Sequence, residues 1–194
     1  MIEPDYKSNY YTKNTGWKYR CRRILWETIF FFFFRTTPRW CLNSWRIFLL
    51  KIFGAKIGKG CRVLPSCYIW APWNLTMGQY SSLSSNVDCY SVDKILIGSR
   101  VTISQRAFLC TASHDIKSLA LPLTSQPIKI EDYAWICAEA FIGPGVNIGH
   151  SSVVYARSVC IKDVMPFKVV GGNPAKVIKD RSLNSVPEEL DSDD

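Results

Sequence analysis

The residue of this chain best suited to acid–base chemistry is a histidine in the segment CTASHD. His114 is one of two histidines among the 194 residues, and Asp115 follows it directly. An imidazole titrates near neutral pH, so it can take a proton from a weak nucleophile such as a hydroxyl group. Such a base needs a partner that fixes its tautomer, and Asp115, Asp88 or a backbone carbonyl could serve. The second histidine, His150, lies in the turn-like segment IGHSS, where we expect a surface role.

Polar side chains precede His114 in the stretch SSLSSNVDCYS. Counting back by the coil lengths of the repeat described next places Asn86, Asp88 and Tyr90 near His114 or across a subunit boundary. These side chains could bind an acceptor or form hydrogen bonds within the corners of the fold, and the sequence favours neither interpretation.

The elements that would position these residues are indicated by a six-residue period. Fifteen positions carry it, twelve of them Ile, Leu or Val, with two slips of two residues and one break of fifteen extra residues. The positions are Ile57, Val63, Ile69, Met77, Leu83, Cys89, Ile97, Ile103, Leu109, Ile130, Ile136, Ile142, Ile148, Val154 and Cys160. A period of six fits neither a helix nor a single strand. It predicts an all-β solenoid of triangular coils whose aliphatic residues point inward. Because the inward positions are aliphatic, we expect the side chain of His114 to face outward at a corner.

The corners of these coils are predicted from the residues that follow each aliphatic position. A small residue stands four positions later in most hexads, and Gly follows directly at five of them. These are Gly58, Gly78, Gly98, Gly143 and Gly149. We expect glycine there because the turn needs a positive φ or a close backbone approach.

The repeat is interrupted and flanked by segments of other character. Residues 115–129 contain two prolines and should project as a loop, and long loops of this kind are often functional. Residues 17–34 and 39–53 read as two amphipathic helices. The segment AKVIKDR, after a Gly-Gly-Asn-Pro turn, is predicted to be a short closing helix. We expect three regions: a polar tail and helical cap (1–56), the solenoid (57–181) and an acidic disordered tail (182–194).

Two interpretations compete for the helical segments. They could cap the open end of the solenoid, as terminal repeats require. Alternatively, the five consecutive Phe residues and several Trp residues could lie in a membrane interface, with Arg residues facing anionic lipid. Capping is the favoured interpretation, and both could hold. The apolar run is too short to span a bilayer.

Composition limits the classes of partner and compartment. The net charge of +8 favours anionic partners, but the basic residues are dispersed and no nucleic-acid motif occurs, so nucleic acid is not expected. Six of the eight cysteines fall within the repeat, where Cys acts as a small apolar residue. Cysteine and histidine spacing predicts no metal site. Free buried thiols and the lack of a secretory signal favour a cytoplasmic location.

The motifs resemble one family. The segments LLKIFGAKIGKG, APWNLTMGQYS and ISQRAFLCTASHD, and the region WICAEAFIGPGVNIGHSSVVYARSVCIKDVMPFKVVGGNPAKVIKD, are similar to those of hexapeptide-repeat acyltransferases. The resemblance covers about residues 17–181 and is nearest to colanic-acid-type exopolysaccharide O-acetyltransferases. It implies a left-handed parallel β-helix, acetyl-CoA as donor and a homotrimer with active sites between subunits.

The resemblance also assigns roles to residues. It makes His114 the catalytic base, and puts Ser84 where galactoside-type enzymes have a substrate-binding Asn. It implies a coenzyme A site formed by three basic side chains, two backbone segments and an aromatic wall. The residues are Lys162, Lys176, Lys179, Ala138, Ala156 and Trp135.

These observations lead to a hypothesis of function with alternatives. We expect a cytoplasmic, acetyl-CoA-dependent O-acetyltransferase that modifies a sugar hydroxyl of a surface glycan, with possible peripheral membrane contact. The acceptor could instead be a free sugar or a small antibiotic. A metal enzyme like the γ-type carbonic anhydrases needs three histidines and the chain has two. A non-catalytic, membrane-docking scaffold is the remaining alternative.

Overall fold

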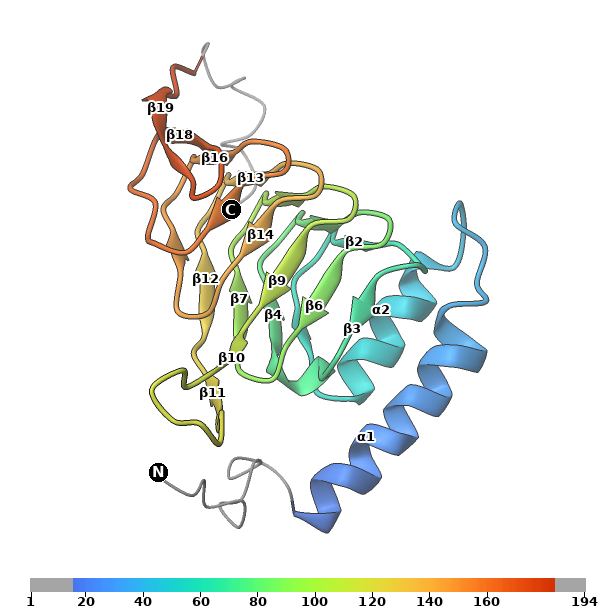
Figure 1. Cartoon of the computed structure of the whole chain (residues 1–194). Helices are drawn as coiled ribbons and strands as arrows, with labels where there is room; N and C mark the ends of the chain where they lie inside the picture. Colours follow the sequence, from blue (N-terminus) through green and yellow to red (C-terminus); the bar gives the residue numbers. More distant parts are fainter. Residues whose placement is uncertain (1–15, 184–194) are drawn as a thin grey trace.

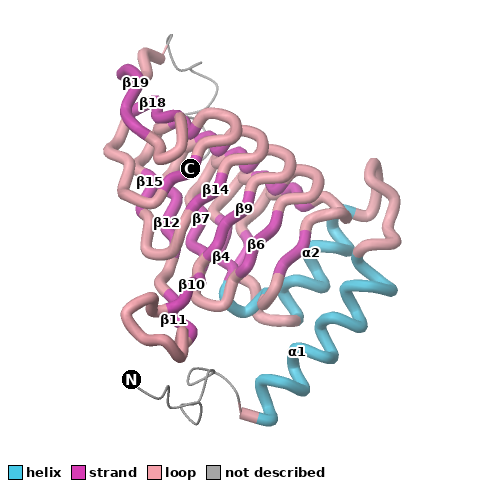
Figure 2. The backbone as a smooth tube through the Cα atoms, viewed as in Figure 1, coloured by secondary structure: helices cyan, strands magenta, loops and turns pink. Residues whose placement is uncertain are grey.

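The chain folds into a prism of stacked coils with helices at one end (Figure 1). The computed structural model describes residues 16–183. The predicted polar N-terminal tail and nearly all of the predicted acidic tail lie outside the described residues. Helices occupy the N-terminal end, and strands and turns form the remainder (Figure 2).

Three sheets form the sides of the prism, here called sides A, B and C, and their strands are parallel except for β19 at the end of side B. Side A contains β1 (Lys56–Ile57), β4 (Leu75–Met77), β7 (Ile95–Ile97), β12 (Ile128–Ile130) and β15 (Asn147–Ile148). Side B contains β2 (Arg62–Val63), β5 (Ser82–Leu83), β8 (Thr102–Ile103), β13 (Trp135–Ile136), β16 (Val153–Val154), β18 (Lys168–Gly171) and β19 (Lys176–Asp180). Side C contains β3 (Tyr68–Ile69), β6 (Asp88–Tyr90), β9 (Phe108–Cys110), β14 (Phe141–Ile142) and β17 (Val159–Cys160).

The predicted six-residue period is confirmed by the register of these sheets. On side A, Ile57 pairs with Met77, Met77 with Ile97, and Ile97 with Ile130. All fifteen predicted positions are inward and at most 7% exposed. Successive coils therefore place one aliphatic side chain on the next, at the strand spacing of about 4.8 Å. Burial of these three columns is the main source of stability.

The corner glycines serve close approach, and other residues supply the left-handed turns. A Cβ on Gly78 would lie 2.5 Å from the backbone carbon of Gly98, so no side chain fits between these coils. The positive φ angles occur two residues later, at Tyr80 (56°) and Arg100 (56°), which are not glycine. The prediction that glycine allows the backbones of neighbouring coils to approach closely is thus correct. The predicted positive φ is mostly found at other residues of the turn.

The N-terminal helices cover the first coil, as the capping interpretation predicts. They are α1 (Trp17–Ile29), the π-helical turn η1 (Phe30–Phe34) and α2 (Asn43–Ile52); a short 3₁₀ turn, η2 (Pro72–Asn74), lies at a later corner. Trp26 is fully buried, and its Nε1 donates a hydrogen bond to the carbonyl of Ile69 at 2.7 Å. The second helix begins at Asn43, later than predicted, because Leu42 has a left-handed φ of 59°.

A buried arginine joins α2 to the first coil. Arg46 is 1% exposed, and its Nε donates to the carbonyl of Val63 at 2.8 Å. Its Nη1 donates to Thr37 Oγ1 and to the carbonyls of Pro38 and Cys41. These acceptors are neutral oxygens, so burial lowers the pKa of the guanidinium. The arginine satisfies backbone groups that the end of a solenoid would otherwise leave unpaired.

The predicted C-terminal helix is wrong. The segment AKVIKDR forms strand β19, which pairs antiparallel with β18. Strand β18 continues side B, because Val169 and Val170 pair with Val153 and Val154. The other edge of β18 would otherwise have unpaired backbone N–H and C=O groups. The segment that follows contains the β-branched residues Val177 and Ile178, which favour a strand, and it forms hydrogen bonds with that edge.

The predicted projecting loop is a β-hairpin arm. Strand β10 (Ala112–His114) pairs antiparallel with β11 (Leu123–Ser125), and the two strands extend from the edge between sides C and A (Figure 1). Residues 128 and 129, which we assigned to the loop, belong to β12. The interruption is therefore shorter than predicted and partly ordered as sheet.

Replacing Trp26 with Ala should lower the free energy of unfolding by about 3–5 kcal/mol, because it removes a buried ring and the hydrogen bond to Ile69. Urea denaturation followed by circular dichroism measures this difference. Trp40→Ala is the control, because Trp40 is 87% exposed and its loss should change stability by about 0.5 kcal/mol or less. An equal decrease in the free energy of unfolding in the two variants would contradict the conclusion that buried Trp26 holds the cap on the first coil.

Candidate active site

His114 lies at the end of the first strand of the arm. Its side chain is exposed, as the sequence predicted. The ring Nδ1 lies 2.6 Å from the carbonyl oxygen of Leu121, at the far side of the hairpin. A carbonyl can only accept a hydrogen bond, so Nδ1 carries the proton in the neutral ring and Nε2 keeps the lone pair. The arrangement leaves Nε2 available as a base.

The backbone carbonyl is therefore the partner that orients His114, among the three that the sequence left open. Leu121 has a φ of 46°, which a leucine adopts only where the surroundings impose it. Asp115 turns elsewhere: its Oδ1 accepts from the backbone N–H of Lys117, and its own N–H donates to Pro122. In the structure, Asp115 thus shapes the loop that presents the Leu121 carbonyl.

A polar network holds the base of the arm. Thr111 is buried, and its hydroxyl donates to the carbonyl of Tyr90 at 2.7 Å and accepts from the N–H of Asp93 at 2.9 Å. The Asp93 carboxylate accepts from Ser125 Oγ at 3.1 Å. The two ends of the arm are thereby tied to the preceding coil, which fixes the position of His114.

Of the four predicted acceptor-binding residues, two lie on side C. Tyr90 is half-buried below Thr111, at the base of the arm. Asp88 is two residues earlier on the same outward face, where its cross-strand partners are Tyr68 and Phe108. Asp88 Oδ1 is buried without a hydrogen-bond partner among residues 16–183, and burial raises the pKa of this carboxyl.

The other two, Ser84 and Asn86, lie at the edge between sides B and C. Asn86 has a left-handed φ of 56°, and its N–H donates to Ser66 Oγ. This edge is opposite the arm, so one protomer does not bring them to His114. For Asn86, the sequence left two placements open, near His114 or across a subunit boundary, and the first does not hold within a single chain.

Two of the predicted coenzyme A residues, Ala138 and Ala156, lie at this B–C edge. Ala138 and Ala156 occupy equivalent positions in successive coils, and the carbonyl of Ala138 accepts from the N–H of Arg157 at 2.9 Å. Trp135 precedes them on side B, is 45% exposed, and donates through Nε1 to Ser104 Oγ. In Figure 1, β13 and β16 lie across the prism from the β10–β11 arm.

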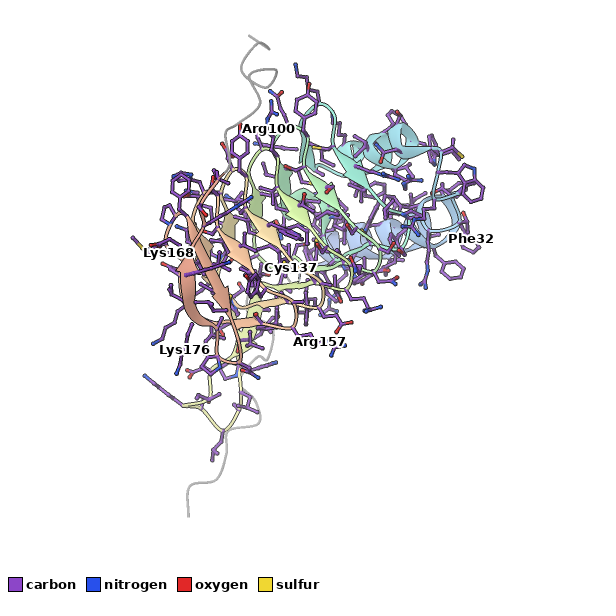
Figure 3. All side chains as sticks on the ribbon, turned by 90° about the horizontal axis from the view of Figure 1, so that it is seen from above. Phe32, Arg100, Cys137, Arg157, Lys168 and Lys176 are labelled. Atoms are coloured by element: carbon purple, nitrogen blue, oxygen red, sulfur yellow. The ribbon has the colours of Figure 1, made fainter. Side chains whose placement is uncertain are left out.

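The three predicted lysines are exposed but do not form one cluster. Lys176 and Lys179 are exposed residues of β19. Figure 3 shows Lys176 at the end of the prism away from the helices. Lys162 lies between sides C and A, on the same edge as the arm. Within one protomer the structure therefore separates Lys162 from the other two.

Two arginines at the B–C edge were not predicted. Arg106 and Arg157 both form ion pairs with Glu139, and these contacts lower the pKa of the Glu139 carboxyl. Two guanidinium groups on one carboxylate leave a positive charge beside Ala138 and Ala156. Arg106, Glu139 and Arg157 occupy the same corner position in three successive coils, each three residues after an inward aliphatic residue, and this pattern in the sequence could have identified them.

The buried cysteines are unsuited to nucleophilic chemistry. Burial raises the pKa of Cys67 to about 12 and that of Cys160 to about 11, and that of Cys89 well above its ordinary value. A thiol acts as a nucleophile only as the thiolate. Six of the eight cysteines are buried, in line with the structural role expected for them. Residues 16–183 contain no group of three or more His, Cys, Asp or Glu placed to hold a metal ion.

Comparison with known proteins identifies the family. No protein-family model matches the chain. The chain is 41% identical over 157 residues to the "Putative colanic acid biosynthesis acetyltransferase WcaF" of Escherichia coli (strain K12), covering 81% of this chain and 86% of the relative. The chain belongs to the hexapeptide-repeat acetyltransferases. The galactoside O-acetyltransferase of the same organism is 33% identical over 138 residues, covering 68% of this chain and 66% of that protein.

Solved structures agree with this assignment. The hexapeptide-repeat acetyltransferase VCA0836 of Vibrio cholerae, complexed with acetyl coenzyme A, is 25% identical with a TM-score of 0.79, covering 87% of this chain and 92% of that chain. A galactoside acetyltransferase in complex with coenzyme A is 26% identical with a TM-score of 0.80, covering 87% and 85%. The fold is thus the left-handed parallel β-helix of hexapeptide-repeat acetyltransferases, as predicted.

The raised pKa of Asp88 has a consequence for stability. Folding disfavours its ionised form, so the penalty is absent below the ordinary carboxyl pKa of about 3.9 and grows as the pH rises through the folded value. Asp88→Asn should therefore raise the urea midpoint at neutral pH, and the gain should shrink as the pH falls. Asp115→Asn is the comparison, with no such gain expected. If the urea midpoint of Asp88→Asn at neutral pH were lower than that of the unmodified protein, the conclusion that this carboxylate is buried without a partner would be wrong.

Proposed function

We propose that this acetyltransferase transfers the acetyl group of acetyl-CoA to a sugar hydroxyl, in the synthesis of an exopolysaccharide or other surface glycan. His114 is the general base. The observation that carries the proposal is the exposed imidazole whose Nδ1 is held by the Leu121 carbonyl, leaving Nε2 free. The relative in colanic acid biosynthesis and the galactoside O-acetyltransferase support a sugar acceptor.

The chemistry follows from the state of the imidazole. Nε2 takes the proton of the sugar hydroxyl as the oxygen attacks the thioester carbonyl, because an unassisted hydroxyl is a poor nucleophile at neutral pH. The Leu121 carbonyl keeps the ring oriented and stabilises the imidazolium through Nδ1. The proton on Nε2 then passes to the leaving thiolate of coenzyme A. Attack is direct in this proposal, because six of the eight thiols are buried and the two exposed ones, Cys21 and Cys41, belong to the N-terminal cap region.

The donor is proposed to bind along the B–C edge. The backbone at Ala138 and Ala156 would accept the pantetheine chain, with the exposed ring of Trp135 as a wall. Charge-assisted contacts from basic side chains would bind the phosphates. Lys162, Lys176 and Lys179 are the predicted residues, and the unpredicted Arg106 and Arg157 lie nearer to the alanines.

We further propose a homotrimer with the active site between subunits. In one protomer, His114 lies on the C–A edge, while Ser84, Asn86, Ala138 and Ala156 lie on the B–C edge. One protomer therefore carries two half-sites on different edges of a three-sided prism. Packing three prisms side by side would bring the arm of one to the B–C edge of the next.

A cytoplasmic location is also proposed. Acetyl-CoA is supplied there, and eight free cysteines are compatible with a reducing compartment. Among the described residues, no helix has the length and apolar character needed to cross a bilayer.

His114→Ala should lower the rate of acetyl transfer about 10²- to 10⁴-fold, the usual contribution of a general base. The assay measures release of free thiol from acetyl-CoA with a panel of sugars, oligosaccharides and small antibiotics as acceptors. His150→Ala is the matched control and should keep its activity. Equal thiol release by His114→Ala and the unmodified enzyme, with a productive acceptor, would refute the assignment. The acceptor preferred in the panel decides between glycans and small molecules.

Hybrid oligomers test the shared site. A chain with His114→Ala and a chain with Ala156→Trp, which would block the donor site, should each be inactive alone. Co-assembly should restore activity at about one quarter of the sites if chains mix at random, because some sites then combine an intact His114 with an intact Ala156. Sedimentation should show a particle of three 22.1-kDa chains. Hybrids that stay inactive would place each site within one chain.

A further inference from the structure

An exposed aromatic surface covers the outer side of the helical cap. We call it the cap surface, and its apolar members are large side chains that are 38–87% exposed. They are Phe31, Phe32, Phe33, Trp40, Trp45 and Phe48. Phe32 points away from the body of the protein, at the end opposite Lys168 and Lys176 (Figure 3). Large apolar groups gathered on one surface mark an interaction site.

The π-helical turn explains why these phenylalanines face outward. Phe30 and Phe34 both pack against buried Trp26, with ring centroids 5.8 and 6.0 Å from it. Because Phe30 and Phe34 point toward the solenoid, residues 31–33 point away from it, toward solvent. The sequence of five Phe residues thus supplies both an inner contact and an outer surface from one turn.

The aromatic residues of η1 and α2 are linked. Trp45 Nε1 donates a hydrogen bond to the carbonyl of Phe33 at 3.0 Å. The rings of Trp45 and Phe48 lie 5.7 Å apart. Phe48 and Trp40 in turn line a cavity of ≈ 850 Å³ between α2 and the first coil. The cap surface is therefore continuous with this cavity.

The cavity is basic. Four of its lining residues carry exposed positive charges and none is acidic; the four are Arg39, Lys51, Lys59 and Arg62. The surrounding sequence is equally biased: residues 16–62 contain eleven Lys or Arg residues and a single acid, Glu27. Glu27 is ion-paired with Arg23. Residues 63–194 contain eleven basic and thirteen acidic residues, so the positive charge of the protein is concentrated at the cap.

Aromatic side chains bordered by basic ones are the pattern of a protein that lies on an anionic bilayer. The rings enter the headgroup region while Lys and Arg attract acidic lipid. A second copy of the chain fits less well, because a two-fold contact would place two positive surfaces against each other. We propose that the cap surface docks on an anionic lipid bilayer. The proposal is independent of the acceptor, and would hold the enzyme at the membrane whatever it acetylates.

Vesicle flotation with the full-length protein tests the proposal. The protein should float with vesicles that contain phosphatidylglycerol, and bind vesicles of phosphatidylcholine alone much less. Added salt should weaken binding, because screening reduces the attraction of surface charges to the bilayer. Lys59→Ala with Arg62→Ala should lower the partition coefficient by roughly tenfold or more, at about fivefold per charge. Phe31→Ser, Phe32→Ser and Phe33→Ser together should reduce it to a similar extent.

The matched control is Lys176→Ala with Lys179→Ala, which removes the same charge from the opposite end of the prism and should leave vesicle binding unchanged. Thermal unfolding shows that each variant is folded. Equal binding to neutral and anionic vesicles, or equal losses in the control and the cap variants, would overturn the proposal. So would a smaller oligomer in the phenylalanine variant, because the surface would then be a contact between copies.

Discussion

Parallel pairing of short strands places each inward side chain directly above its equivalent in the previous coil. This contact, repeated along three columns, sets every other dimension of the molecule. It fixes the distance between coils, and that distance leaves no room for a Cβ at Gly78. It also fixes which residues face outward on each side, since neighbouring side chains of a strand alternate. The positions of Asp88 and Trp135 on the surface follow from the burial of Cys89 and Ile136.

A stack of coils has two ends, and different elements cover them in this protein. At the first coil, Trp26 closes the apolar column, and Arg46 satisfies backbone carbonyls with a charge that has no carboxylate partner within residues 16–183. At the last coil, β19 covers the edge of β18 as an antiparallel strand. The cap and the first coil (residues 16–62) together carry eleven basic residues, whereas the second solution leaves a strand that is exposed along its whole length. The asymmetry of charge along the prism is a result of how its ends are closed.

The sequence was sufficient to predict the columns, the helices that cover the first coil and the exposure of His114, because each depends on local periodicity. It could not show that AKVIKDR is a strand, since the hydrogen bonds of that segment come from β18. Nor could it identify the Leu121 carbonyl as the partner of His114, because a positive φ on a leucine leaves no mark in the sequence. Counting coils gave the coil of Asn86, but its edge of the prism became clear only from the strand order.

The hairpin that carries His114 is attached to the solenoid at a single corner. Thr111 and Asp93 hold its base, while the columns on either side continue from β9 and β7 to the next coil without it. The coils beneath therefore do not depend on the tip, but the tip carries the Leu121 carbonyl that orients His114. A change in the length or composition of the tip would alter the direction of the imidazole while the triangular body stays folded.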